Sequence, residues 1–251
     1  MNSHITLANL FTTAVRPKMF LDFDGTISKV DVIDAILEKF ADDRWLEVES
    51  DWVSGKIGSR ECLQKQFSYV KAAPEDLFGF VDTLDIDQGF NLVMDFCRTA
   101  QITFHIVSDG FEQYIRRMLH RYLGDTPLKD DVAISANSLL STTEGRWRTA
   151  FPYFVESCQD GCATCKPALM KLYNPASANI IFVGDGLSDR FAAAEATVVF
   201  AKSKLADYCE TNSIPYISYQ TLEDIATHLG KASNSAGYNI PDEIFTFREA
   251  I

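Results

Sequence analysis

The sequence contains no apolar stretch of about 20 residues, the length that a membrane-spanning helix needs, so we expect no membrane segment. Its first residues lack the basic start and the apolar core of a signal peptide, which favours a cytoplasmic location. Residues 1–17 are interpreted as a short extension that packs on, or trails from, the first strand. No internal repeat or low-complexity tract is present.

Positive charge is also scarce. The 251 residues include 23 Lys and Arg against 35 Asp and Glu, which gives a formal net charge of -12. Because binding to nucleic acid depends on positive charge, we expect no nucleic-acid partner. A small anionic substrate remains compatible with this charge if a local positive group holds it. The sequence leaves the oligomeric state open.

Cysteine is too infrequent for a disulfide framework, with six residues in the whole chain. Three of them, Cys158, Cys162 and Cys165, form a C-x3-C-x2-C pattern. Structural zinc usually takes four ligands, and no fourth ligand is evident. We favour a loop of reduced thiols, and a zinc-held loop or a regulatory disulfide remain the alternatives.

Apolar runs that end in polar residues alternate with segments of helical periodicity. The runs "KMFLDF" (18–23), "ITFHIVSDG" (102–110) and "NIIFVGDG" (179–186) predict buried strands, and the second of these strands is expected to end at Ser108. Residues 31–40 and 59–70 repeat apolar positions at helical spacing, with Ser59 as a candidate N-cap. This alternation predicts an α/β fold, a Rossmann-like parallel sheet with helices on both faces.

Residues 29–88 show helical patterns and no convincing strand. We therefore expect an α/β core domain of residues 1–28 and 89–251, and a small helical cap domain of residues 29–88. Such a cap closes over a substrate and excludes water. A strand-turn-strand within residues 138–151 is expected to form a flap near the site.

Polar residues follow three of the predicted strands: Asp22 and Asp24, Ser108 and Asp109, and Asp185 and Asp189. In open α/β sheets, ligands bind beyond the carboxyl ends of the strands. Alternate residues at a strand end point the same way, so Asp22 and Asp24 can face one point. Carboxylate oxygens suit Mg²⁺, and these motifs contain no His or Cys that would favour zinc.

These residue types support phosphate chemistry. One carboxylate can attack phosphorus to form an aspartyl-phosphate, and the other can protonate the leaving oxygen and then activate water. Ser108, at the predicted start of a helix, and Lys166, at the start of another, can bind an anion. In the alternative interpretation, the same residues have only structural roles: they form turns, cap helices or lie as charged groups in solvent. Their order along the chain favours the chemical interpretation.

The motifs "DFDGT" (22–26), Ser108, Lys166 and "GDGLSD" (184–189) resemble, in order, those of the haloacid dehalogenase superfamily of phosphatases. The resemblance extends over residues 18–225. It implies that Asp22 is the nucleophile and Asp24 the general acid and base. It further implies Mg²⁺ held by the Asp22 carboxylate, the Asp24 carbonyl and Asp185, with Asp189 supporting the water shell. The phosphoryl group would be bound by Ser108, Lys166, Gly25 and Thr26.

The helical insertion resembles the cap of the phosphoserine phosphatase branch. Within that branch the chain is most similar to methionine-salvage phosphatases, which act on 2-hydroxy-3-keto-5-methylthiopentenyl 1-phosphate and also have cysteines before the motif lysine. The cap arginine and glutamate of phosphoserine phosphatases correspond to Gln66 and Asp31, which disfavours phosphoserine. Ser108-Asp109 is similar to the second motif of vertebrate phosphoethanolamine/phosphocholine phosphatase, so Asp109 is a candidate to attract an amine.

The sequence thus predicts a Mg²⁺-dependent phosphatase that acts on a small phosphorylated metabolite, with the methionine-salvage enol phosphate as the first candidate. A phosphoethanolamine/phosphocholine-type or phosphoserine-like phosphatase is the alternative within the same chemistry. A phosphomutase or phosphotransferase, in which a hydroxyl replaces water, also remains open. A silent phosphate-binding protein is a further alternative, but such a protein has no need of Asp24.

Overall fold

The computed structural model describes residues 7–124, 132–142 and 145–237. Ten α-helices and seven β-strands occur within these ranges. The strands form one sheet in the order β4-β3-β2-β1-β5-β6-β7, in which β1, β5, β6 and β7 pair in parallel and β3 pairs with β4 in antiparallel. The predicted α/β class with a mostly parallel sheet is confirmed. None of the described helices is long and apolar enough to cross a membrane.

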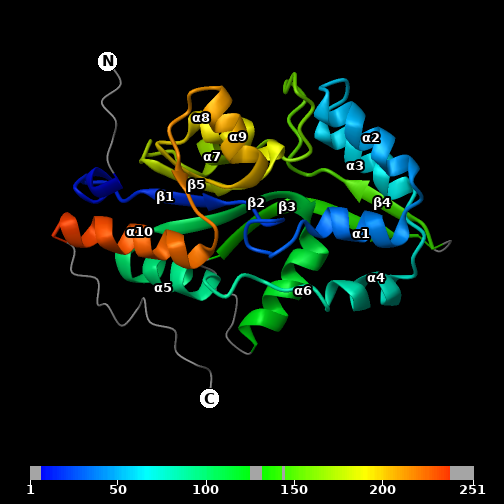
Figure 1. The fold of residues 1–251 in the computed structure, drawn as a ribbon, viewed down its shortest axis with the longest axis horizontal. Helices are drawn as coiled ribbons and strands as arrows, with labels where there is room; N and C mark the ends of the chain where they lie inside the picture. Colours follow the sequence, from blue (N-terminus) through cyan, green and yellow to red (C-terminus); the bar gives the residue numbers. More distant parts are fainter. Residues whose placement is uncertain (1–6, 125–131, 143–144, 238–251) are drawn as a thin grey trace. The chain divides into compact units, whose positions relative to one another are not determined.

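One compact unit takes in the described parts of Met1–Leu21, Asp87–His105 and Met170–Ile251. Its strands are β1 (Lys18–Leu21), β5 (Ile180–Gly184), β6 (Val198–Ala201) and β7 (Ile217–Ser218). In the register of β1 and β5, Leu21 lies opposite Val183. These strands are almost continuously apolar because both of their faces are covered. Figure 1 shows α5 and α10 on one side of them and α8 and α9 on the other.

The helices of this unit are α5 (Phe90–Ala100), α8 (Arg190–Glu195), α9 (Ser203–Thr211) and α10 (Leu222–Ser235), with short 3-10 helices η1 (Leu7–Phe11) and η2 (Leu187–Asp189). Part of the N-terminal extension is ordered here, since Leu10 and Phe11 are buried and η1 packs against α10. The Phe11 ring also meets Phe96 of α5 edge to face, with ring centres 6.0 Å apart. The extension therefore contributes to the core of this unit.

The second unit takes in Asp22–Ile86 and the described parts of Ile106–Leu169. Its helices are α1 (Val32–Phe40), α2 (Arg44–Val53), α3 (Ser59–Ser68), α4 (Pro74–Val81) and α6 (Glu112–Leu123). Residues 29–88 are helical as expected, apart from a bridge between Ser28 and Ile86. These compact units have different bounds from the predicted core and cap, whose functional division stays a prediction.

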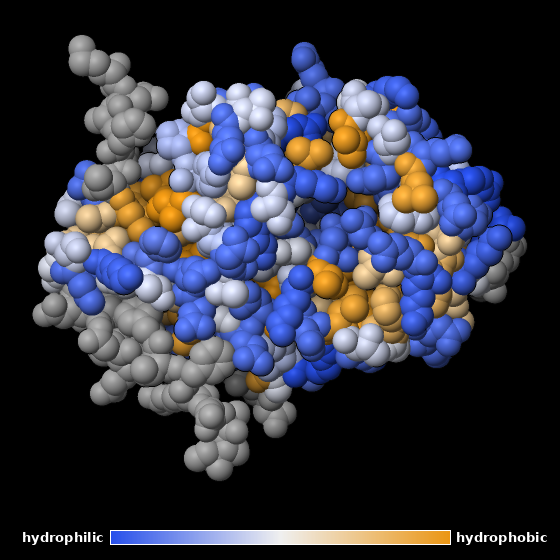
Figure 2. Space-filling view, in the orientation of Figure 1, coloured by the Kyte–Doolittle hydropathy of each residue, from blue (hydrophilic) through white to orange (hydrophobic). Residues whose placement is uncertain are grey.

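A β-hairpin formed by β3 (Val132–Ser141) and β4 (Trp147–Ala150) confirms the strand-turn-strand, with Ser141 opposite Trp147. The Trp147 indole N–H donates to the carbonyl oxygen of Ala72 at 3.1 Å, which fixes the hairpin to the helical insertion. Its role as a flap stays a prediction. On the face seen in Figure 2, hydrophilic residues predominate and apolar side chains are exposed in several places, which is usual for a protein surface.

Candidate active site

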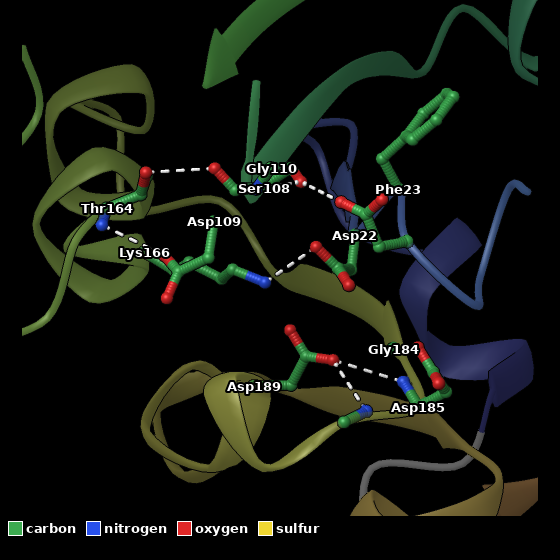
Figure 3. Close-up of polar contacts among 12 residues, drawn as sticks. Asp22, Phe23, Ser108, Asp109, Gly110, Thr164, Lys166, Gly184, Asp185 and Asp189 are labelled. Atoms are coloured by element: carbon green, nitrogen blue, oxygen red, sulfur yellow. Dashed lines mark hydrogen bonds and ion pairs between the residues drawn. The ribbon is translucent and has the colours of Figure 1, made fainter. Parts of the chain in front are cut away.

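Asp22 follows the apolar strand β1 directly and is 4% exposed. Lys166, the first residue of α7 (Lys166–Tyr173), is 1% exposed. Its ammonium group donates a 2.7 Å hydrogen bond to Oδ1 of Asp22 (Figure 3). A buried carboxylate is costly unless a partner compensates its charge, and Lys166 is that partner. The predicted helix start at Lys166 is confirmed.

Asp24 lies two residues further on and is also buried. The hydroxyl oxygen of Tyr114, on α6, lies 2.8 and 2.9 Å from its two carboxyl oxygens, and the Ser108 hydroxyl donates to Oδ2 at 3.1 Å. Burial raises the pKa of Asp24 to about 6, although the hydrogen bonds from Tyr114 and Ser108 and the charge of Lys166 lower it. The carboxyl group is therefore held in place by two hydroxyl groups.

Gly110 makes this arrangement possible. A Cβ atom at position 110 would lie 2.1 Å from the Tyr114 hydroxyl oxygen and 2.2 Å from Oδ2 of Asp24. Both distances are far below van der Waals contact, so a larger residue would separate the tyrosine from the carboxyl group. The absence of a side chain at this position is a steric requirement of the Asp24 site.

The structure places Ser108 and Asp109 inside strand β2 (Thr103–Phe111), which corrects the prediction that Ser108 ends its strand at a helix start. Phe111, still extended at φ -114° and ψ 130°, is the N-cap of α6. The free N–H groups of a helix start are therefore not adjacent to Ser108, and Asp109 is not a helix cap. The apolar run "ITFHIV" gave no sign that the strand continues through Gly110.

Thr164 joins β2 to the loop that precedes Lys166. Its hydroxyl donates to the carbonyl oxygen of Ser108 at 2.9 Å, and its main-chain N–H donates to Oδ1 of Asp109 at 2.9 Å (Figure 3). The side-chain amide of Asn137, on β3, donates to the carbonyl oxygen of Asp109 at 2.7 Å. The Asp109 carboxylate thus has a structural function within the protein.

Asp185 and Asp189 belong to the other compact unit and follow β5 there. Oδ2 of Asp189 accepts hydrogen bonds from the N–H groups of Asp185 and Gly186, at 3.0 and 3.1 Å. A Cβ atom on Gly184 would lie 2.3 Å from that oxygen, so this glycine lets the carboxylate approach the main chain. Asp189 is fully buried, whereas Asp185 is half-buried.

The loop after Asp24 folds back on itself. Gly25 has a positive φ of 72°, and its N–H donates to the carbonyl oxygen of Val30 and the hydroxyl of Ser28, both at 3.1 Å. Thr26 is fully buried, and its N–H donates to the carbonyl oxygen of Phe23. A left-handed conformation of this kind favours glycine. Phosphate binding by Gly25 and Thr26 stays a prediction.

Asp31 and Gln66, which correspond to the cap glutamate and arginine of phosphoserine phosphatases, both have partners in the helical insertion. Asp31 is the N-cap of α1 and accepts a 3.0 Å hydrogen bond from the N–H of Asp34. Gln66 is 1% exposed, and its side-chain amide donates to Oε2 of Glu49 at 3.0 Å. Substrate recognition by these residues stays a prediction.

Sequence reasoning missed Tyr114, Thr164 and Asn137. Tyr114 occupies an apolar position of a helix, where an aromatic residue usually indicates core packing. Thr164 and Asn137 are ordinary polar residues whose partners lie 27 or more positions away in the chain. The one available signal was that Thr164 stands two residues before the motif lysine.

No family model matches the chain. A 2-hydroxy-3-keto-5-methylthiopentenyl-1-phosphate phosphatase of Brevibacillus brevis is 31% identical over 210 residues, which cover 82% of this chain and 92% of that protein. One of Geobacillus thermodenitrificans is 30% identical over 215 residues, covering 84% and 94%. A substrate-bound phosphoserine phosphatase structure has a TM-score of 0.63 at 19% identity and covers 85% of this chain and 99% of its own. That identity supports the fold alone.

The mostly parallel α/β sheet and the 31% identity to a phosphatase over most of both chains identify the protein as a phosphatase of the haloacid dehalogenase type, a phosphoric monoester hydrolase. The expected superfamily is thereby confirmed. Within it, the chain belongs to the family of the Brevibacillus and Geobacillus phosphatases.

Proposed function

We propose that the protein hydrolyses a small-metabolite phosphomonoester through an aspartyl-phosphate on Asp22, with Mg²⁺ as cofactor. The observation that carries this proposal is the buried ion pair of Asp22 and Lys166 beside the hydroxyl-bound carboxyl group of Asp24. A silent binding protein has no need of this second carboxyl group or of the residues that orient it.

Each residue has a distinct role in this mechanism. The Asp22 carboxylate, paired with the Lys166 ammonium group, attacks phosphorus and forms the acyl phosphate. Lys166 also offsets the negative charge of the transferred phosphoryl group, which Ser108 helps to bind. Asp24, oriented by Tyr114 and Ser108, protonates the leaving oxygen and then accepts a proton from the attacking water.

We propose that the carboxylates of Asp22, Asp185 and Asp189, with the carbonyl oxygen of Asp24, form the magnesium site. The register supports this, because Leu21 lies opposite Val183 and the chains leave β1 and β5 at neighbouring points. The donor set consists of oxygen atoms alone, as a hard cation prefers. When bound, Mg²⁺ neutralises charge on the phosphate oxygens.

The names of the relatives suggest the substrate, and we propose 2-hydroxy-3-keto-5-methylthiopentenyl 1-phosphate. Two contacts agree with a substrate that carries neither an amine nor a carboxylate. The Asp109 carboxylate already accepts the N–H of Thr164, and Gln66 bonds to Glu49 in place of a cationic clamp. We also propose a cytoplasmic location, in keeping with six free cysteines.

The test is release of inorganic phosphate in the presence of Mg²⁺ from the enol phosphate, phosphoethanolamine, phosphocholine, phosphoserine, sugar phosphates and an aryl phosphate. Asp22→Asn serves as the blank, and we expect it to bind esters without releasing phosphate. Chelation of the metal should abolish release, and added Mg²⁺ should restore it. Phosphate release by Asp22→Asn would exclude the covalent mechanism. Release from no ester would favour a phosphomutase, a phosphotransferase or a silent binding protein.

A further inference from the structure

The loop that precedes Lys166 contains three neighbouring thiols. Cys158, Cys162 and Cys165 are all free and half-buried, whereas the other three cysteines, Cys62, Cys97 and Cys209, are buried. The loop belongs to the same compact unit as Asp22 and Asp24. The mechanism proposed above uses none of its sulfur atoms.

Cys158 is the central sulfur atom of this group. It accepts hydrogen bonds from the main-chain N–H groups of Asp160 and Cys162 and from the thiols of Cys162 and Cys165. Although burial acts to raise it, these hydrogen bonds lower the pKa of the Cys158 thiol. Burial raises the pKa of the Cys162 and Cys165 thiols, and the negative charges of Asp109 and Cys158 raise it further. Cys158 therefore lies beside two thiols whose pKa values are higher than its own.

The surrounding contacts hold this loop in place. The sequence suggested Ser59 as the N-cap of α3, but the structure gives that position to Gly58. The Ser59 hydroxyl instead accepts the N–H of Ala163 at 2.8 Å, and the N–H of Arg60 donates to the carbonyl oxygen of Gly161 at 3.1 Å. A loop bonded to a helix in this way keeps its thiols close to one another.

We propose that Cys158 is a modification site, oxidised by a hydroperoxide and then joined in a disulfide to Cys162 or Cys165. The Cys158 sulfur attacks the peroxide, an S–O bond forms as the O–O bond breaks, and the oxidant leaves as water or an alcohol. The sulfur is thereby oxidised by two electrons to a sulfenic acid. The neighbouring thiol then attacks this sulfur, the S–S bond forms, and the hydroxyl group leaves with the thiol proton as water.

A half-buried thiol beside two further thiols has two features that oxidant-sensitive cysteines share, access from solvent and a resolving partner. Metal binding is less well supported. Among the residues that the structure describes, these three sulfur atoms are not grouped closely enough to share one ion. A bound zinc ion is therefore an outcome that the test must detect.

The test uses the full-length protein, reduced, freed of reductant and treated with hydrogen peroxide, after which the remaining thiols are alkylated. Trypsin leaves all three cysteines on one peptide of residues 149–171, because Lys166 precedes proline. Cleavage before Asp160 then separates Cys158 from the other two. We expect peroxide to produce a disulfide that joins the two fragments, and reductant to release them. Cys62, Cys97 and Cys209 should remain unmodified as internal controls.

Two variants make the assignment specific. Cys158→Ser should give no joined fragments. In the double variant Cys162→Ala/Cys165→Ala, the Cys158 sulfenic acid should persist and react with dimedone. The proposal is overturned if Cys158 stays reduced while other thiols oxidise, if the disulfide joins only Cys162 and Cys165, or if each chain carries a zinc ion that protects the thiols. These results do not depend on phosphatase activity.

Discussion

Tyr114→Phe removes one hydroxyl group and leaves the aromatic ring of a fully buried residue in place. The Asp24 carboxyl group would lose its contacts at 2.8 and 2.9 Å and retain the Ser108 hydroxyl at 3.1 Å. It could then rotate away from the position in which, according to the proposed mechanism, it transfers a proton. We therefore expect a selective loss of proton transfer to the leaving group.

The size of the effect follows from the type of bond that is lost. A hydrogen bond to a charged group contributes about 1.5–3 kcal/mol. If the whole contribution is felt in the transition state, the rate falls by roughly 10- to 150-fold. Because Ser108 still holds one carboxyl oxygen, we expect a value in the lower part of this range.

The assay compares kcat/KM for an alkyl phosphomonoester with kcat/KM for a nitrophenyl phosphate. An alkoxide leaves poorly and needs a proton, which the proposed mechanism takes from Asp24, whereas a nitrophenolate leaves without one. Tyr114→Phe should therefore slow the alkyl ester by the factor above and the aryl ester by much less. Tyr216→Phe is the matched control, because its hydroxyl donates to Glu210 on α9 at 2.7 Å.

An equal loss on both esters would refute the reasoning, since it would assign Tyr114 a structural role only. An unchanged alkyl rate would show that Ser108 alone orients Asp24. Gly110→Ala offers an independent check, because the added methyl group forces the same carboxyl group and hydroxyl apart. It should reproduce the selective loss on the alkyl ester.

Three further predictions concern stability, measured by urea unfolding. Thr164→Val leaves the carbonyl oxygen of Ser108 and Oδ1 of Asn137 without their donor and should lower the free energy of unfolding by about 1–3 kcal/mol. Thr149→Val is the control and should be neutral or stabilising, because the buried Thr149 hydroxyl has no partner among the described residues. Equal losses in the two variants would contradict this reasoning. In Gly58→Ala, the added Cβ would lie 2.5 Å from the carbonyl oxygen of Gly161, so the protein should lose about 1–3 kcal/mol of stability. Gly79→Ala, whose Cβ would meet no atom within 4 Å, should not be destabilised. Similar stabilities of the two variants would refute the clash. Burial and the charge of Lys18 lower the pKa of His105 to about 4. Below pH ~6.5 the unfolded chain therefore binds a proton at this histidine that the folded chain excludes. The free energy of unfolding should fall by up to about 3 kcal/mol as the pH is lowered from ~6.5 to about 4. His105→Phe should remove that part of the pH dependence, and an unchanged dependence would exclude this histidine.

The elements were predictable because their signals are local. The strand at 18–21 and the helix at 32–40 follow from apolar runs and helical spacing within a few residues. Asp22, Asp24 and Lys166 were predicted as site residues because their types suit phosphate chemistry and their order in the chain resembles that of the superfamily's motifs. Burial of all three agrees with the roles expected for them.

The contacts that hold these residues were not predictable, because their signals are not local. Tyr114 bonds to Asp24 across 90 positions of the chain, and Lys166 bonds to Asp22 across 144. The strand end was misplaced for a related reason. Gly110 usually indicates a turn, but here it extends β2, because only a residue without a side chain fits against the Asp24 carboxyl group.

Gly110 and Tyr114 therefore form a pair that the motif itself does not reveal. A tyrosine can bond to both oxygens of Asp24 only if nothing occupies the space where the Cβ of residue 110 would be. A chain with a larger residue at 110 must orient its second aspartate by other means. The Cβ of an alanine at position 110 would also lie 2.2 Å from Oδ2 of Asp24, so a shorter side chain at position 114 should not restore the carboxyl orientation of a Gly110→Ala protein.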